Sequence, residues 1–174
     1  FEELRVQEAD LWARWEEWQR RIDLAKTLVR PGDILVLADE APVRTLQAAA
    51  LRTSAQCLQS LGEYETGMVQ CERALKLDPE NLQSRLLRAL LLNRLGRFEE
   101  ARDQMEKVLR DHPDDGEARG LMGRLHKEAC LAAWRQEDVN PREEAAAGAR
   151  LLEQAYTAYE NGFVREPGNY YPGI

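Results

Sequence analysis

The sequence predicts an all-α fold, an α-solenoid of antiparallel helix pairs with a long N-terminal helix and an elongated last hairpin. Its main support is an internal repeat: residues 62–79 and 96–113 share a glycine, an aromatic residue two positions later and a closing proline, all offset by 34 positions. A period of this length is typical of stacked helix–turn–helix units. Composition agrees, since 32% charged and 44% hydrophobic residues suit a folded helical chain.

Residues 1 to about 30 are predicted to form one long helix. Its apolar residues recur at helical spacing, and it carries three tryptophans: Trp12, Trp15 and Trp18. Pro31 and Gly32 are expected to end this helix. The apolar run within 33–42 is too short to separate an extended segment from a helical turn, and we expect a connector there.

Two placements of the N-terminal helix remain open. Residues 1–30 either lie against the concave face of the repeats, touching Leu86, Leu90 and Leu121, or stack on residues 43–60 as an end cap. Both placements would cover apolar surface that is unfavourable in water.

The repeat helices are predicted near 43–60, 64–77, 81–95 and 98–111. We therefore expect an N-terminal segment, 1–42, and a repeat domain, 43–174, with repeats at about 48–81, 82–115 and 116–169. The third repeat carries about 20 extra residues, near 131–150. Leu131 continues one helix, and Asn140 with Pro141 is a good start for the next. Both helices of the last pair should therefore be about ten residues longer than usual.

The 34-residue pattern resembles the tetratricopeptide repeat. That family places mostly apolar residues at eight slots of each repeat. The first copy fills these slots with Leu51, Ser54, Ala55, Leu58, Gly67, Cys71, Ala74 and Pro79. The second copy fills them with Arg85, Arg88, Ala89, Leu92, Ala101, Met105, Val108 and Pro113. The resemblance implies an α-solenoid whose first helices line a concave binding face.

A narrower resemblance covers residues 116–174. Gly123, Arg124, Lys127 and Glu128 are followed by an Ala155–Tyr159–Gly162 set and a Tyr-Pro-Gly-Ile end at 171–174. This looks like the TRAF-binding helical-repeat region of the apoptosis-signal-regulating kinases and its bacterial relatives. The resemblance implies regulatory protein binding without catalysis by this region.

The chain shows no convincing catalytic, metal or cofactor motif. His112 falls in a turn slot and His126 in a core aromatic slot, and the acidic clusters alternate with basic residues as solvated helix faces do. The formal net charge of −7 disfavours nucleic acid as the main partner. No apolar run reaches the length of a membrane span. We therefore expect neither an enzyme nor a membrane protein.

Three cysteines, Cys57, Cys71 and Cys130, lie far apart without a CxxC pair. Buried reduced thiols are the expected state, which suits a reducing compartment and a cytoplasmic location. The chain begins at Phe1 rather than methionine, and we expect it to be part of a longer protein.

The candidate binding surface is the concave face. The slots that face it hold four leucines, Leu86, Leu87, Leu90 and Leu121, edged by basic residues. Such a patch is a liability if left bare. In the chaperone-binding subset this face carries a carboxylate clamp, which Arg52 and Gln56 imitate only loosely and which Leu87, Glu117 and Leu121 break. The predicted partner-binding residues are Arg52, Gln56, Leu87, Leu90, Asn93, Arg94, Arg124 and Lys127.

Two functional hypotheses follow. The first is a non-catalytic protein-interaction module that binds a peptide, a helix or a neighbouring domain on its concave face. The second is the regulatory solenoid of a larger signalling or effector enzyme whose catalytic domain lies outside this chain.

Overall fold

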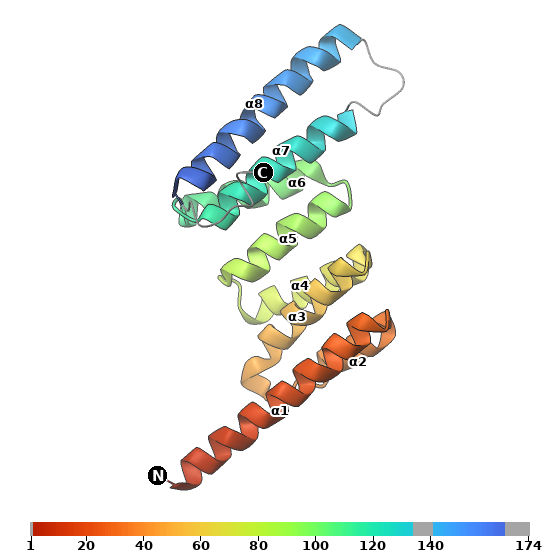
Figure 1. Cartoon of the computed structure of the whole chain (residues 1–174), viewed down its shortest axis with the longest axis vertical. Helices are drawn as coiled ribbons and strands as arrows, with labels where there is room; N and C mark the ends of the chain where they lie inside the picture. The colour runs from red at the N-terminus through yellow and green to blue at the C-terminus, as the bar shows by residue number, and fades with distance from the viewer. Residues whose placement is uncertain (1, 134–140, 166–174) are drawn as a thin grey trace. The chain divides into compact units, whose positions relative to one another are not determined.

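The computed structural model describes residues 2–133 and 141–165. Within those ranges the regular secondary structure is entirely helical (Figure 1), which confirms the all-α fold class. The chain divides into two compact units, Phe1–Leu91 and Leu92–Ile174. The α-helices are α1 Glu2–Thr27, α2 Pro31–Asp39, α3 Gln47–Ser60, α4 Tyr64–Leu77, α5 Leu82–Arg94, α6 Phe98–Asp111, α7 Gly116–Ala133 and α8 Pro141–Arg165.

The expected connector at 33–42 is wrong, because residues Pro31–Asp39 form helix α2. Pro31 occupies the start of the helix, where its missing N–H costs nothing. Ile34, Leu37 and Ala38 then fall at helical spacing and are all buried. The apolar run was ambiguous in the sequence because nine residues make only about two and a half helical turns, too few to show a clear period.

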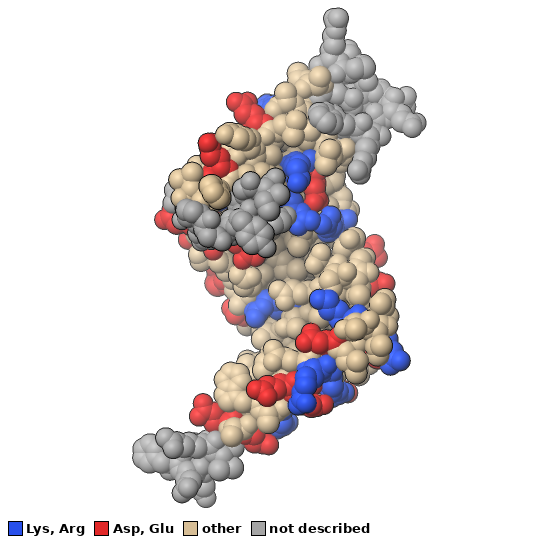
Figure 2. Space-filling view, in the orientation of Figure 1, with Lys and Arg blue, Asp and Glu red and all other residues tan. Residues whose placement is uncertain are grey.

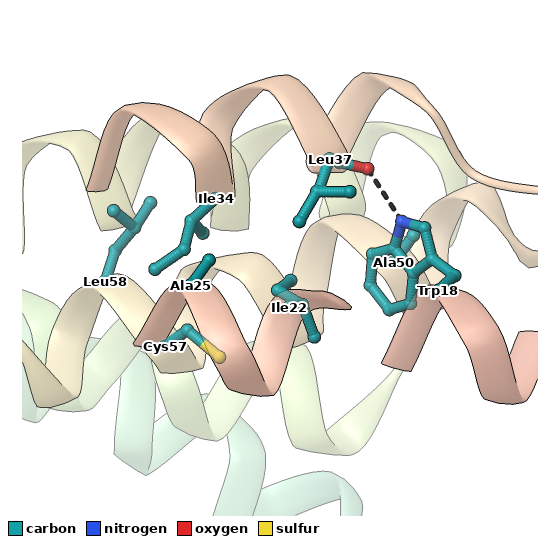
Figure 3. Packing of buried hydrophobic residues seen from close by; sticks show 8 residues of the cluster. All are labelled: Trp18, Ile22, Ala25, Ile34, Leu37, Ala50, Cys57 and Leu58. Carbon is teal, nitrogen blue, oxygen red and sulfur yellow. Dashed lines mark hydrogen bonds between the residues drawn. The ribbon is translucent and has the colours of Figure 1, made fainter. Parts of the chain in front are cut away.

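Helix α1 packs against α2 and α3 through an apolar cluster (Figure 3). Its members come from all three helices and are Trp18, Ile22, Ala25, Ile34, Leu37, Ala50, Cys57 and Leu58. The Trp18 indole Nε1–H donates a hydrogen bond to the Leu37 carbonyl oxygen at 2.8 Å, so this polar group is satisfied inside the cluster. Trp15 stacks on Trp18 with 4.8 Å between ring centroids. These contacts place α1 where the end-cap alternative expected it.

The remaining helices of the first unit follow the repeat pattern closely. Gly62 adopts a φ of 84° at the turn between α3 and α4, a conformation that glycine tolerates and other residues rarely do. Asn81 caps α5, since its Oδ1 accepts hydrogen bonds from the Ser84 backbone N–H and hydroxyl, both at 3.0 Å. Arg88 is an unusual residue at a core slot. Its Nε–H donates a hydrogen bond to Glu72 Oε1 at 2.6 Å.

The second unit contains α6, α7 and α8. Gly96, at the turn before α6, has a φ of 75° and repeats the role of Gly62. Asp115 caps α7 by accepting a hydrogen bond from the Ala118 backbone N–H at 2.7 Å. Helices α7 and α8 form the last hairpin, and α8 is 25 residues long against 14 for α6. Pro141 begins α8 as predicted, while Asn140 lies outside the described residues.

All three cysteines are buried free thiols, as predicted. Desolvation raises the pKa of Cys57, and it raises the pKa of Cys71 to about 12, with Glu72 adding to the effect. Among the described helices, none combines the length and apolarity that a membrane crossing needs.

Candidate functional site

The eight predicted partner-binding residues divide evenly between the two units. Arg52, Gln56, Leu87 and Leu90 lie in the first unit, and Asn93, Arg94, Arg124 and Lys127 lie in the second.

In the first unit these residues differ in their surroundings. The Arg52 guanidinium donates to Asn81 Oδ1 at 3.1 Å, so it supports the cap of α5. Gln56 is exposed and Leu90 is half-buried. Arg52 thus has a structural contact in addition to any role in binding.

Leu86 and Leu87, which the slot assignment places on the concave face, are buried, with only 4% and 6% exposed. The leucine and alanine residues of α5 are spread around the helix instead of forming one stripe. Ala89, Leu91 and Leu92 are also buried, and so are the polar residues Ser84 and Arg85, so α5 is covered on several sides. Leu121 is half-buried.

In the second unit three of the predicted residues converge on one carboxylate. Asn93 Nδ2 donates a hydrogen bond to Glu128 Oε2. Arg124 Nε donates to Glu128 Oε1 at 2.9 Å, and Arg94 Nη1 lies 3.5 Å from the same oxygen. The side chains of Arg94, Arg124 and Glu128 are only 29%, 26% and 22% exposed, so solvent screens them less than a surface pair. Figure 2 shows basic side chains gathered between the C-terminal half of α7 and the end of α5.

A cavity of about 330 Å³ adjoins this network. Its lining is part polar and part apolar and consists of Asn93, Arg94, Phe98, Glu128, Leu131 and Ala132. Within the described part of the chain, Asn93 Oδ1 and Arg94 Nε are buried without a hydrogen-bond partner. Because buried polar groups are nearly always paired, these two atoms are exceptions within the described ranges.

Lys127, three residues after Arg124 on α7, makes an aromatic contact with α8. Its Nζ lies 5.9 Å from the centroid of the Tyr159 ring on α8. Tyr159 reaches this position because α7 and α8 approach closely at Gly123, where an added Cβ would lie 3.0 Å from the tyrosine ring carbons. The sequence motif around Gly123 therefore serves both helix packing and the placement of charged groups.

Sequence reasoning missed Glu128 as the residue that joins the site. The signal was present in part, because Glu128 follows Arg124 by four residues and both lie on the same helix face. Phe98, Leu131 and Ala132 carried no comparable signal, since their contribution depends on how α6 and α7 meet.

A larger cavity, of about 930 Å³, lies among α6, α7 and α8, and His126 is in its wall. Burial, and secondly the nearby Arg102, lower the pKa of His126, while Glu106 acts in the opposite direction. No group of three or more His, Cys, Asp and Glu side chains in the described ranges is arranged to hold a metal ion.

Comparison with curated proteins gives two short matches. The chain is 32% identical over 81 residues to sperm-associated antigen 1 of Rattus norvegicus and 31% identical over 81 residues to that of Mus musculus. Each match covers 47% of this chain and 9% of the relative's length.

Solved structures with the same fold include MamA from Desulfovibrio magneticus RS-1, with a TM-score of 0.59 and 17% identity over 91% of this chain and 79% of that one. A tetratricopeptide repeat protein from Parabacteroides merdae matches with a TM-score of 0.56 and 16% identity, covering 93% of this chain and 69% of that one. At this level of identity the likeness concerns the fold alone, and it confirms the tetratricopeptide-type α-solenoid.

The narrower likeness to the apoptosis-signal-regulating kinases stays a prediction. The model of the family described as Tetratricopeptide Repeats-Sensor matches residues 63–174, well over half of the chain, and the protein therefore belongs to that family.

Proposed function

We propose that the protein is a non-catalytic interaction module that binds a peptide or helix of a protein partner. Tetratricopeptide repeats are generally protein-interaction modules, which supports this class of function. The observation that carries the proposal is the convergence of Asn93, Arg94 and Arg124 on Glu128 beside a cavity.

Charge and geometry make this network suited to recognition. Arginine presents several donors in a planar fork, so two guanidinium groups held by one carboxylate offer an ordered set of donors to a partner. Pre-ordering these side chains lowers the entropy that binding would otherwise cost. Lys127 extends the same surface and is exposed.

The test is capture of protein partners by the full chain and by an Arg94→Ala/Arg124→Ala double variant. A matched control, Arg110→Ala/Arg150→Ala, removes the same charge at two exposed arginines of α6 and α8. We expect the first variant to lose partners that the wild type and the control both retain. Equal capture by all three proteins would contradict the proposal.

A second role is favoured by the description of the family as a sensor. In this second role, the solenoid regulates an effector enzyme within a larger protein. The signal that the solenoid detects is binding of a partner at Asn93, Arg94, Arg124 and Glu128. Attaching the natural flanking sequence and measuring whether a bound partner changes the effector's activity separates this role from simple binding.

A further inference from the structure

Three helices among the described residues end in the same hydrogen-bonded turn, and one of these turns carries an unexpected residue. After α3 and α5, the N–H of Gly62 and of Gly96 donates to the carbonyl oxygen three residues earlier, and the next N–H donates to the carbonyl oxygen five residues earlier. Both glycines have a positive φ, as this turn requires. The turn after α1 has the same two hydrogen bonds, but there Val29 takes the glycine position with a φ of 54°.

Valine is unfavourable at this position. A side chain branched at Cβ crowds the backbone at positive φ, so a valine there is strained whereas a glycine is not. Val29 is 67% exposed, so packing within the described part of the chain does little to offset the strain. A strained residue with an exposed apolar side chain is expected where that side chain contacts another molecule.

The neighbours of Val29 line a groove between α1 and α2. Leu28 and Arg30 are both part of its wall, and its volume is about 270 Å³. The wall also includes Leu24 and Val36, and these two residues and Leu28 are exposed large apolar side chains. Exposed apolar residues gathered along one groove are typical of a surface that another molecule covers. We refer to this feature as the α1–α2 groove.

Oppositely charged side chains are paired at each end of the α1–α2 groove. Near the turn, Arg30 Nη1 lies 3.7 Å from Asp33 Oδ2, and at the other end Arg21 Nη2 lies 3.0 Å from Glu40 Oε2. The two helices run in opposite directions from the turn (Figure 1), so the apolar residues lie between these ion pairs. Each end therefore carries one charge of each sign on exposed side chains.

We propose that the α1–α2 groove binds a second copy of this chain in a two-fold symmetric dimer. A two-fold axis that crosses the groove in the plane of the contact turns the second copy end for end. The apolar residues of the two copies then face each other, and Val29 adds apolar area next to them. Each end of the contact gathers two arginines and two carboxylates, so the charges balance. This self-complementarity is what an isologous dimer requires.

Other occupants fit the α1–α2 groove less well. An anionic lipid surface attracts an excess of basic residues, whereas both arginines here are paired with carboxylates. A strongly charged peptide meets the same balance of charges. A small molecule usually occupies a pocket of about 300–1,000 Å³ that buries most of its surface, and this groove is smaller. The groove also lies outside residues 63–174, which match the family, so the dimer does not depend on the proposed function.

The first experiment measures the mass of the protein in solution by sedimentation equilibrium. Between about 1 µM and about 500 µM, we expect the average mass of the wild type to rise from that of one chain towards that of two, as a small reversible contact requires. The double variant Leu28→Ser/Val36→Ser should dimerise at least about tenfold more weakly, because each copy loses two apolar side chains.

The matched control is Leu77→Ser/Val69→Ser. It replaces the same residue types at two exposed positions of α4, in the same unit. We expect this control to dimerise as the wild type does, and circular dichroism should show that both double variants are folded.

The substitution Val29→Gly distinguishes a lost contact from a folding defect. It removes the strain at positive φ, so the protein should melt at a higher temperature at a concentration where it is a single chain. It also removes an apolar side chain from each copy, so the dimer should be about tenfold weaker. A folding defect would lower the melting temperature instead. Val29→Gly therefore still decides the question if Leu28→Ser/Val36→Ser does not fold.

Three results would overturn the dimer. They are the mass of one chain at every concentration, dimerisation that the substitutions at the groove leave unchanged, and equal weakening by the control on α4. Binding of a different protein in the groove of a chain that stays single would make that protein the occupant. Because Arg94 and Arg124 are unchanged in all these variants, partner capture that depends on them tests the proposed function separately.

Discussion

At the scale of single residues, Gly123 shows how closely the last two helices approach. An added Cβ would lie 3.0 Å from the Tyr159 ring and 3.1 Å from the Ala155 carbonyl oxygen. We predict that Gly123→Ala lowers the free energy of unfolding by about 1–3 kcal/mol, because overpacking outweighs the usual gain in helix propensity. Urea unfolding followed by circular dichroism measures this change.

The control for Gly123 is Gly32, which lies in the first turn of α2, where an added Cβ would meet no atom within 4 Å. Gly32→Ala should leave the protein equally stable or stabilise it by up to about 1 kcal/mol. Stabilisation by both substitutions would show that the α7–α8 contact at Gly123 has room for a methyl group.

His126 should make stability depend on pH. Its pKa is lowered in the folded protein, so the unfolded chain binds more protons once the pH falls below about 6.5, the ordinary histidine value. The contribution of neutral His126 is thus fully present above that pH and is lost as the pH falls towards the folded pKa. An NMR titration of His126 should give a midpoint below 6.5.

The variant His126→Phe tests the same linkage by unfolding. It should reduce the fall in stability between about pH 7.5 and about pH 6, whereas His112→Gln, at the other histidine, should not alter the contribution of His126. If the free energy of unfolding of His126→Phe depends on pH as that of the wild type does, His126 is not the source of this dependence.

At the scale of elements, the α1 helix acts as the cover of α2 and α3. Removing residues 1–30 would expose Ile34, Leu37 and the neighbouring face of α3 to water. We expect this truncated protein to lose several kcal/mol of stability and to aggregate. A truncation of residues 1–13 spares the buried cluster and should be close to wild type in thermal melting.

A gain of partner binding by a still-folded 31–174 protein would be the contrary result. It would mean that α1 occupies a binding surface in solution, as the concave-face placement supposes, instead of covering the end of the repeats.

Sequence periodicity predicted some elements far better than others. Helices α4 and α6 begin and end at the predicted residues, because Gly62, Gly96 and the prolines at 79 and 113 mark the turns clearly. Helix α2 was missed because its apolar stripe is too short to show a period. The burial of Leu87 was missed as well, because a slot assignment does not reveal that α5 is covered on several sides.

The candidate site was predictable only in part for a similar reason. Asn93, Arg94 and Arg124 were predicted as partner-binding residues, but Glu128, whose carboxylate joins them, was not. Their common contact with Glu128 depends on how the end of α5 meets α7, which is a tertiary property that one helix period does not contain.

At the scale of the whole molecule, the three cysteines are distributed over both compact units. Cys57 and Cys71 lie in the first unit and Cys130 in the second, and all are buried. We predict that none reacts with a thiol reagent at neutral pH until its unit opens, because burial blocks access and thiolate formation is disfavoured for Cys71, whose pKa is about 12.

Mass spectrometry of labelled peptides over increasing urea would follow each thiol separately. We expect all three to be labelled as the helical signal is lost. Rapid labelling of Cys71 in the native protein would contradict the packing between α4 and α5, where its Sγ lies 3.3 Å from the Ser84 carbonyl oxygen.

The stacked indoles of α1 give this protein a built-in optical reporter. Trp15 and Trp18 lie nearly parallel, with 14° between their planes, and Trp18 is 2% exposed whereas Trp12 is 57% exposed. Two transition dipoles held this close couple, so they should produce a paired band in the ultraviolet circular dichroism spectrum. Loss of that band, together with a red shift of fluorescence, would signal release of α1 without any added label.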